Sequence, residues 1–242
     1  MEQTKGNLRI DGMFTSEGGE YEKIVINGQG TVTSNVQADC IKVNGIGNFQ
    51  GNVNSGTIII SGMATIKEGV VADELKVSGM ATIEGDVETD KLKIEGKTTI
   101  QGNVESDEVK IEGKATIHGD CETETFKMEG QIKIKGQLNA ESIHINSVLK
   151  SEIHEITGSS IQIVRDTNPI TSVVTKALDM VFTNNLAVNT IEGDQIELDY
   201  VNARVVRGEN VTIGEHCEID LIEYSGALKQ HPRAKIKEAR KM

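Results

Sequence analysis

Glycines at a fixed interval constrain this chain more than any other feature of its sequence. Seven of them recur every 17 residues, at Gly28, Gly45, Gly62, Gly79, Gly96, Gly113 and Gly130. A strict short period without a helix-length gap is typical of repeat architectures. A unit of this size cannot bury a hydrophobic face alone, whereas stacked units can. The sequence therefore predicts a solenoid in which each repeat packs on its neighbours.

Large apolar residues stand at fixed offsets from each glycine. In one unit, counted from Gly79, they are Ile83, Val87, Leu92 and Ile94. Small residues fill two further offsets, two and ten residues after the glycine. Successive inward residues are therefore 2, 4, 2, 3 and 2 positions apart. A spacing of 2 is the side-chain alternation of a β-strand, and the spacings of 4 and 3 mark corners where this alternation is interrupted. We expect an all-β parallel solenoid with three short strands per turn of about 17 residues.

A second glycine series is expected to turn the chain at corners with a positive φ. Its members are Gly51, Gly85, Gly102, Gly119 and Gly136. Two outward columns carry opposite charges on the same strand, lysine in one and glutamate in the other. We expect ion pairs between these columns to offset the repulsion within each, at a few tenths to about 1 kcal/mol per exposed pair.

The repeat divides the chain into five segments. Residues 1–27 form an irregular first turn, 28–164 the regular solenoid, and 165–185 a linker with an amphipathic helix. Residues 186–225 form further irregular turns, and 226–242 a basic tail that we expect to be disordered. Asn168 and Pro169 begin the helix, because Asn caps helices and Pro favours their first position. Its apolar stripe could dock a partner or pack on the solenoid; the candidate partner residues are Val173, Val174, Leu178, Val181 and Phe182.

Composition agrees with a solenoid and narrows the function. Aromatic residues make up only 3% of the 242 residues, which suits identical narrow turns with no irregular space to fill. The net charge of −12 argues against nucleic acid as a partner. Three cysteines without close spacing suggest a reducing, cytoplasmic location. No run of 18 apolar residues predicts a membrane-spanning helix, and the N-terminus lacks a signal-peptide pattern.

The sequence presents no constellation that would support catalysis. No His, Cys, Asp or Glu group has metal-ligand spacing, and the five histidines do not pair with a nucleophile. His118 and His144 occupy outward repeat positions that other turns fill with unrelated side chains. We therefore expect a protein that is not an enzyme and has no catalytic residue, metal or cofactor.

The repeat from about Gly28 to Asn146 resembles the bactofilins, which are bacterial polymer-forming cytoskeletal proteins. The resemblance rests on copies such as GMATIEGDVETDKLKIE and GKTTIQGNVESDEVKIE. It implies a right-handed parallel β-helix that forms filaments without a nucleotide. It also implies that the filament positions other proteins, with roles in cell shape, the envelope or motility.

Open sheet edges at the solenoid end could join copies, because unpaired backbone groups template further strands. The candidate edge residues are Leu8, Ile10, Ile24 and Ile26. The expected partners are the chain itself and protein cargo, with peripheral membrane or envelope contact through the basic tail. Two alternatives remain: a monomeric adaptor, or an enzyme resembling the left-handed β-helix acyltransferases. The period of 17, rather than 18, is a poor fit to the latter.

Overall fold

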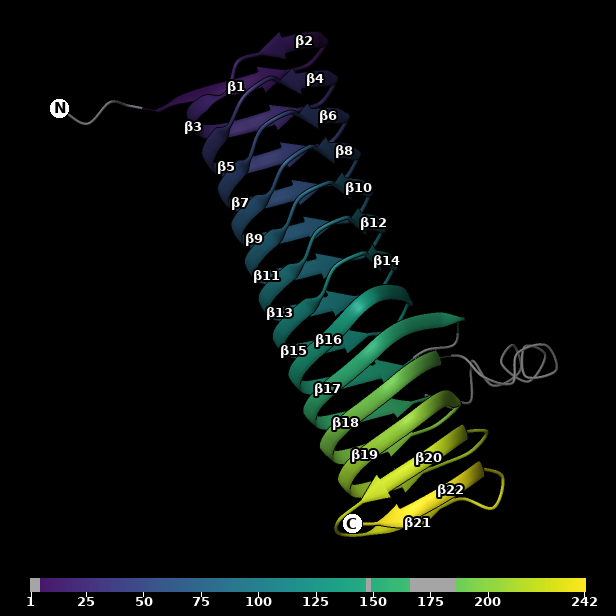
Figure 1. Cartoon of the computed structure of the whole chain (residues 1–242). Helices are drawn as coiled ribbons and strands as arrows, with labels where there is room; N and C mark the ends of the chain where they lie inside the picture. Colours follow the sequence, from purple (N-terminus) through teal and green to yellow (C-terminus); the bar gives the residue numbers. More distant parts are fainter. Residues whose placement is uncertain (1–4, 147–148, 166–185) are drawn as a thin grey trace. The chain divides into compact units, whose positions relative to one another are not determined.

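The structure is a computed structural model that describes residues 5–146, 149–165 and 186–242. The chain divides into two compact units, Met1–Gly119 and Asp120–Met242, which we treat one at a time. All regular elements of the described residues are β-strands, and their pairings are parallel (Figure 1).

The first unit alternates long and short strands. Its long strands after the first turn have eight residues and its short strands have four. The strands are β1 (Gly6–Ile10), β2 (Met13–Ser16), β3 (Gly19–Ile26), β4 (Gln29–Val32), β5 (Val36–Val43), β6 (Ile46–Phe49), β7 (Val53–Ile60), β8 (Met63–Ile66), β9 (Val70–Val77), β10 (Met80–Ile83), β11 (Val87–Ile94), β12 (Lys97–Ile100), β13 (Val104–Ile111) and β14 (Lys114–Ile117). Each long strand pairs with the next long strand, and each short strand with the next short one. Figure 1 shows the two stacks side by side.

The predicted solenoid and its inward columns are confirmed. Leu92 pairs with Leu75 and with Val109, so equivalent residues of successive turns lie beside each other. On β11, Val87, Thr89, Leu92 and Ile94 are all buried, and alternation breaks between the second and third of them. The long strand therefore turns a corner in its middle, and the three inward pairs per turn lie on two strands rather than three.

The repeat glycines are required by close stacking of the backbone. A Cβ on Gly79 would lie 2.0 Å from the carbonyl oxygen of Gly62, and one on Gly96 would lie 1.9 Å from that of Gly79. Ordinary contacts of a Cβ are longer than about 3.4 Å. The same clash with the preceding turn occurs at Gly28, Gly45, Gly62 and Gly113. Gly130, the last glycine of the series, is buried.

The positive φ expected for the second glycine series is wrong. Among the glycines of the described residues, Gly19 alone has a positive φ, of 133°. A ladder of Asn and Asp side chains fills the corner instead: the backbone N–H of Asn52 donates to Asn35 Oδ1 at 2.9 Å, and that of Gly69 to Asn52 Oδ1 at 3.0 Å. A Cβ on Gly102 would lie 2.3 Å from the corresponding carboxylate oxygen of Asp86, so glycine leaves room for this ladder.

The second unit contains four long strands between shorter ones. Its strands are β15 (Cys121–Met128), β16 (Gln131–Asn146), β17 (Ser151–Val164), β18 (Leu186–Leu198), β19 (Val201–Ile213), β20 (Glu218–Tyr224), β21 (Leu228–Gln230) and β22 (Lys235–Lys241), of which β16 to β19 are the long ones. β16 to β19 pair in sequence, and Gly158, Gly193 and Gly208 stack at one position of this ladder. The corner ladder recurs here: the N–H of Gln137 donates to Asp120, that of Glu215 to Asp199, and that of Ala227 to Asn210.

The sequence predicts a helix and a disordered tail in this half of the chain. The helix expected within 165–185, with Val173, Val174, Leu178, Val181 and Phe182, falls on residues 166–185, outside the part of the chain that the structure describes. The disorder expected of 226–242 is wrong, since β21 pairs with β19 and β22 pairs with β20. A tail with few apolar residues becomes ordered because the previous turn offers a strand edge and acidic partners.

Candidate self-assembly site

The first turn of the solenoid is formed by β1 and β2. β1 pairs with β3, and β2 with β4. No strand of the described residues pairs with the other edge of either, so this end presents open backbone groups. Figure 1 shows β1 and β2 beyond β3 and β4 at the purple end of the chain. An open edge of this kind is where a further strand can add.

The structure places the four predicted edge residues mostly in the interior. Leu8 pairs with Ile24 and Ile10 with Ile26, so β1 covers both β3 residues. Ile10, Ile24 and Ile26 are fully buried, and Leu8 is half-buried. Only Leu8 and Ile10 lie on an edge strand. Gly12 and Gly28 are 16 residues apart, so the first turn departs from the 17-residue period. For this reason the period does not identify the outermost turn in the sequence.

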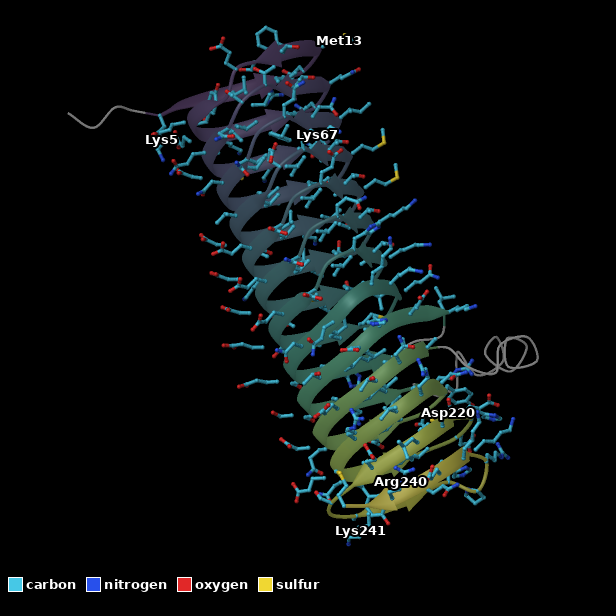
Figure 2. All side chains as sticks on the ribbon, viewed as in Figure 1. Lys5, Met13, Lys67, Asp220, Arg240 and Lys241 are labelled. Atoms are coloured by element: carbon cyan, nitrogen blue, oxygen red, sulfur yellow. The ribbon has the colours of Figure 1, made fainter. Side chains whose placement is uncertain are left out.

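Sequence reasoning missed the two apolar residues that are exposed at this end. Met13 is 82% exposed and Phe14 is 59% exposed, both on β2. Phe14 pairs with Gly30 and so begins the inward column of small residues that continues through Gly47 and Ala64. The signal was available, since Phe14 stands two residues after Gly12, where the other units have a small residue. Figure 2 shows Met13 at the outer tip of this unit.

Charged groups at the same end are paired within the chain. Arg9 Nε donates to Asp11 at 2.8 Å, and Asn27 donates to the same carboxylate at 2.7 Å. The hydrogen bond from Arg9 comes first among the causes that lower the pKa of Asp11. Lys5 lies 3.5 Å from Asp39. Arg9 with Asp11 and Lys5 with Asp39 therefore form two ion pairs at this end of the unit.

The last two strands of the second unit present a different kind of edge. β22 is exposed and carries alternating cations, which pair with acids of the preceding turn: Lys235 with Glu218 at 2.6 Å and Lys237 with Asp220 at 2.7 Å. Arg240 pairs with Glu238 on the same strand at 2.7 Å. Figure 2 labels Asp220, Arg240 and Lys241 in this region. Lysine on an edge strand is a usual means of blocking unwanted pairing.

The lateral charge columns behave as the sequence predicts. Glu95 lies 2.7 Å from Lys93 and 3.0 Å from Lys76, and Glu112 lies 2.7 Å from Lys110. The hydrogen bond from Lys93 is the largest cause that lowers the pKa of Glu95, to about 2. Each glutamate therefore bridges lysines within and between turns of the first unit.

The buried cysteines of the described residues are not activated, and no metal-binding cluster is present among these residues. Burial raises the pKa of the Cys121 thiol to about 12 and that of Cys217 to about 11, so both are protonated at neutral pH. Cys40 is half-buried, and none of the three cysteines is in a disulfide. Within the described ranges, no three His, Cys, Asp or Glu side chains lie close enough to hold a metal ion. No helix among these residues is long and apolar enough to span a bilayer.

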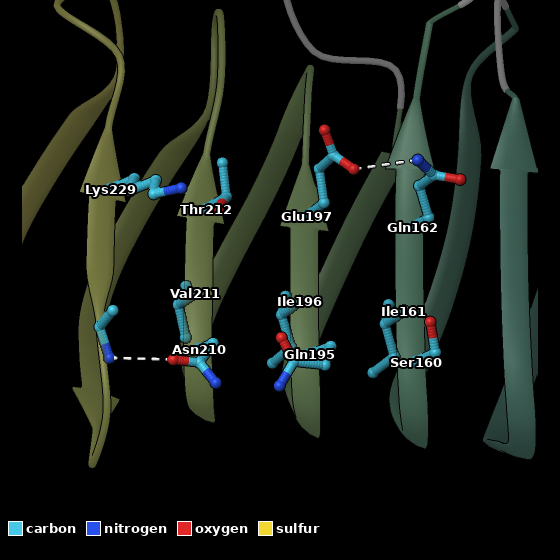
Figure 3. A pocket seen from close by; sticks show the side chains of 11 residues that line it. Ser160, Ile161, Gln162, Gln195, Ile196, Glu197, Asn210, Val211, Thr212 and Lys229 are labelled. Atoms are coloured by element: carbon cyan, nitrogen blue, oxygen red, sulfur yellow. Dashed lines mark hydrogen bonds between the residues drawn. The ribbon is translucent and has the colours of Figure 1, made fainter.

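The second unit has an open polar groove of about 620 Å³ (Figure 3). It crosses β17, β18, β19 and β21, and Gln162 Nε2 donates to Glu197 in it at 2.9 Å. Its polar lining residues are Ser160, Gln162, Gln195, Glu197, Asn210, Thr212 and Lys229. Glu197 is the single carboxylate among them, and no histidine or cysteine lines the groove.

Comparison with known proteins adds independent information on the repeat. Residues 55–139 match the family model described as "Bactofilin: Polymer-forming cytoskeletal". Two proteins of Bacillus subtilis (strain 168), the uncharacterized proteins YhbE and YhbF, are each 42% identical to the chain over 57 residues. Those residues are 24% of this chain and 24% of each relative, so the match spans about a quarter of the relatives' length. No solved structure matches the chain.

The resemblance that the 17-residue repeat predicts is therefore confirmed over residues 55–139, where the chain matches the bactofilin family model.

Proposed function

We propose that this protein is a non-catalytic scaffold that assembles through the ends of its solenoid into filaments without a nucleotide. The observation that carries the proposal is the open end at β1 and β2, with Met13 and Phe14 exposed there. The family description, polymer-forming cytoskeletal, supports the same conclusion.

The physical argument concerns what a second copy would bury. When two copies meet through the same end, the contact is isologous, so each side chain is used twice. Fully burying a side chain the size of Phe or Met contributes about 1.5–3 kcal/mol. Met13 is 82% exposed and Phe14 59% exposed, so both residues from both copies would contribute roughly 4–8 kcal/mol before the cost of association, which is itself several kcal/mol. Backbone hydrogen bonds between the two edge strands would add direction to the contact.

A filament also needs a second contact, for which the second unit offers the exposed strands β21 and β22. Two copies of β22 would bring lysines against lysines, in spite of their pairing with Glu218 and Asp220. This second contact is the weaker one, and salt should strengthen it by screening the cations. The two ends thus differ in chemistry, one apolar and one charged.

The test is electron microscopy and sedimentation velocity of the full chain and of the Phe14→Asp variant. The unmodified chain should form filaments without added nucleotide, and Phe14→Asp should stop growth at species no larger than dimers. Val71→Asp is the matched control, because Val71 is also exposed, at 44%, but lies on the outer face of β9. Discrete monomers of the unmodified chain at high concentration would contradict the proposal and favour a monomeric adaptor.

The cellular role is proposed on the same basis. Such a filament would position partner proteins in the cytoplasm, with roles in cell shape, the envelope or motility; the three free thiols fit a reducing compartment. Cations of the C-terminal segment, such as Lys229 and Lys241, could add a peripheral membrane contact. Flotation of the protein with anionic and with neutral vesicles tests that contact directly.

A further inference from the structure

The short strands β4, β6, β8, β10, β12 and β14 of the first unit stack into one sheet (Figure 1). We call the side of this sheet that carries their outward residues the short-strand face. Two columns cover most of it. The first column is Gln29, Ile46, Met63, Met80, Lys97 and Lys114, and the second is Thr31, Asn48, Thr65, Thr82, Thr99 and Thr116.

Exposed apolar side chains gather in the first column. Ile46 is 36% exposed, Met63 is 42% exposed and Met80 is 48% exposed, and these three stand in register on consecutive turns. Met13 of β2 pairs with Gln29 and so extends the same column. Neighbouring turns fill this position with Lys97 and Lys114, so the fold itself does not require an apolar residue here. A contiguous exposed apolar row that folding does not require points to an interaction.

The face is also nearly free of charge around these residues. From Thr31 to Thr82 the second column is uncharged, and Lys67 and Glu84, which border it, form an ion pair with each other. The outer side of the long strands, by contrast, carries the lysine and glutamate columns. Neither column carries a charge between Gln29 and Thr82, so this part of the face does not repel a copy of itself, whereas the long-strand face would bring like charges together.

We propose that the short-strand face packs against the same face of a second copy, so that filaments associate side by side. The row has Met63 at its centre: Met13, Gln29 and Ile46 stand on one side, and Met80, Lys97 and Lys114 on the other. An antiparallel arrangement places Met63 on Met63 and Ile46 on Met80. It also places Lys97 opposite Gln29, so that no lysine of this row meets a lysine. A parallel arrangement would stack Lys97 on Lys97 and Lys114 on Lys114.

The size of the face explains why this contact depends on the filament, and the inference therefore rests on the proposed function. Six strands of four residues, each about 13 Å long and about 4.8 Å apart, cover roughly 400 Å². Stable interfaces bury about 800 Å² per partner. One copy is too small for a lasting contact, but a filament repeats the contact along its length, and avidity multiplies weak sites.

The experiment compares filaments of the full chain with those of a Met63→Lys/Met80→Lys double variant by negative-stain electron microscopy. These substitutions copy what the chain already has at Lys97 and Lys114, so folding should be kept, and circular dichroism checks it. The full chain should form paired or bundled filaments, and the double variant single filaments of unchanged length. Val71→Lys is the control, since it adds a lysine to an exposed apolar position elsewhere, and it should leave the pairing intact.

The outcomes separate this inference from the proposed function. Single filaments of the full chain, or bundles that persist in the double variant, would overturn the lateral contact and leave end-to-end assembly standing. Single filaments that bind anionic vesicles through Met63 and Met80 would overturn it in favour of a lipid surface. Absence of filaments from the full chain would overturn both proposals. Discrete dimers that Met63→Lys/Met80→Lys converts to monomers would support the lateral contact and contradict the filament.

Discussion

Replacing Gly79 by alanine tests the account of backbone stacking directly. The added Cβ would lie 2.0 Å from Gly62 O, 2.4 Å from Ser61 O and 2.7 Å from Ser61 C. The turn must move by about 1.4 Å to restore ordinary contact, against the dense packing of the stacked turns. The movement breaks or weakens two backbone hydrogen bonds, from Gly79 N to Ile60 O at 3.0 Å and from Met80 N to Gly62 O at 2.8 Å.

The magnitude follows from these two bonds. A buried backbone group left without its partner costs about 1–3 kcal/mol, so two of them cost roughly 2–6 kcal/mol. At about 2–4 °C per kcal/mol for a chain of this size, the melting temperature should fall by roughly 4–24 °C. Thermal denaturation followed by far-ultraviolet circular dichroism measures it, in the Phe14→Asp background so that assembly does not contribute.

Gly12 provides the matched control, because it occupies the same position in the first turn but has no described turn before it. A Cβ at Gly12 meets no atom within 4 Å, so Gly12→Ala should leave the melting temperature unchanged or raise it slightly. If Gly79→Ala melts within about 2 °C of Gly12→Ala, the stacking argument is refuted.

Four further predictions concern single side chains. Glu95→Gln should remove part of the acid dependence of unfolding. Because the pKa of Glu95 is lowered from 4.5 to about 2, its ionised carboxylate stabilises the fold above pH 4.5, and this contribution is lost as the pH falls toward about 2. Melting curves of both proteins across that pH range measure the effect. Mass spectrometry after alkylation of the native protein at pH 8 should find Cys40 modified and Cys121 protected, since burial raises the pKa of the latter to about 12. Thr98→Val should stabilise the fold by about 1 kcal/mol in urea unfolding, because the buried Thr98 hydroxyl has no hydrogen-bond partner among the described residues. Asn52→Ala should destabilise it by about 1 kcal/mol in the same assay, because Asn52 Oδ1 accepts a backbone N–H of the next turn.

The repeat predicts the interior of the first unit nearly residue by residue, because a period of 17 assigns every apolar position at once. Val87, Leu92 and Ile94 are buried where the spacing places them. The glycines show the limit of this reasoning. Gly85 was expected to have a positive φ, but its neighbours decide its role: a Cβ there would meet the Glu68 carbonyl carbon at 2.6 Å. The distance between the backbones of neighbouring turns arises only when the turns stack, so the residues around one glycine do not reveal it.

The ends of the solenoid were harder to predict for a related reason. A periodic pattern identifies a turn by its neighbours on both sides, and an outer turn has only one. Ile24 and Ile26 therefore seemed to be an edge, although β1 covers them. In the C-terminal segment, Ile236 is the only large apolar residue of β22, too weak a signal for a strand. Pairing with β20 and the ion pairs of its lysines order it.

The corner ladder has a consequence for the order in which the turns form during synthesis. From Asn35 onward, the side-chain oxygen belongs to the earlier turn and the backbone N–H to the later one, as between Asn35 and Asn52, Asp86 and Asn103, and Asp199 and Glu215. A ribosome delivers the earlier turn first, so each new turn meets an acceptor that is already in place. The chain can thus wind up progressively as it is synthesised, with each finished coil serving as the template for the coil that follows.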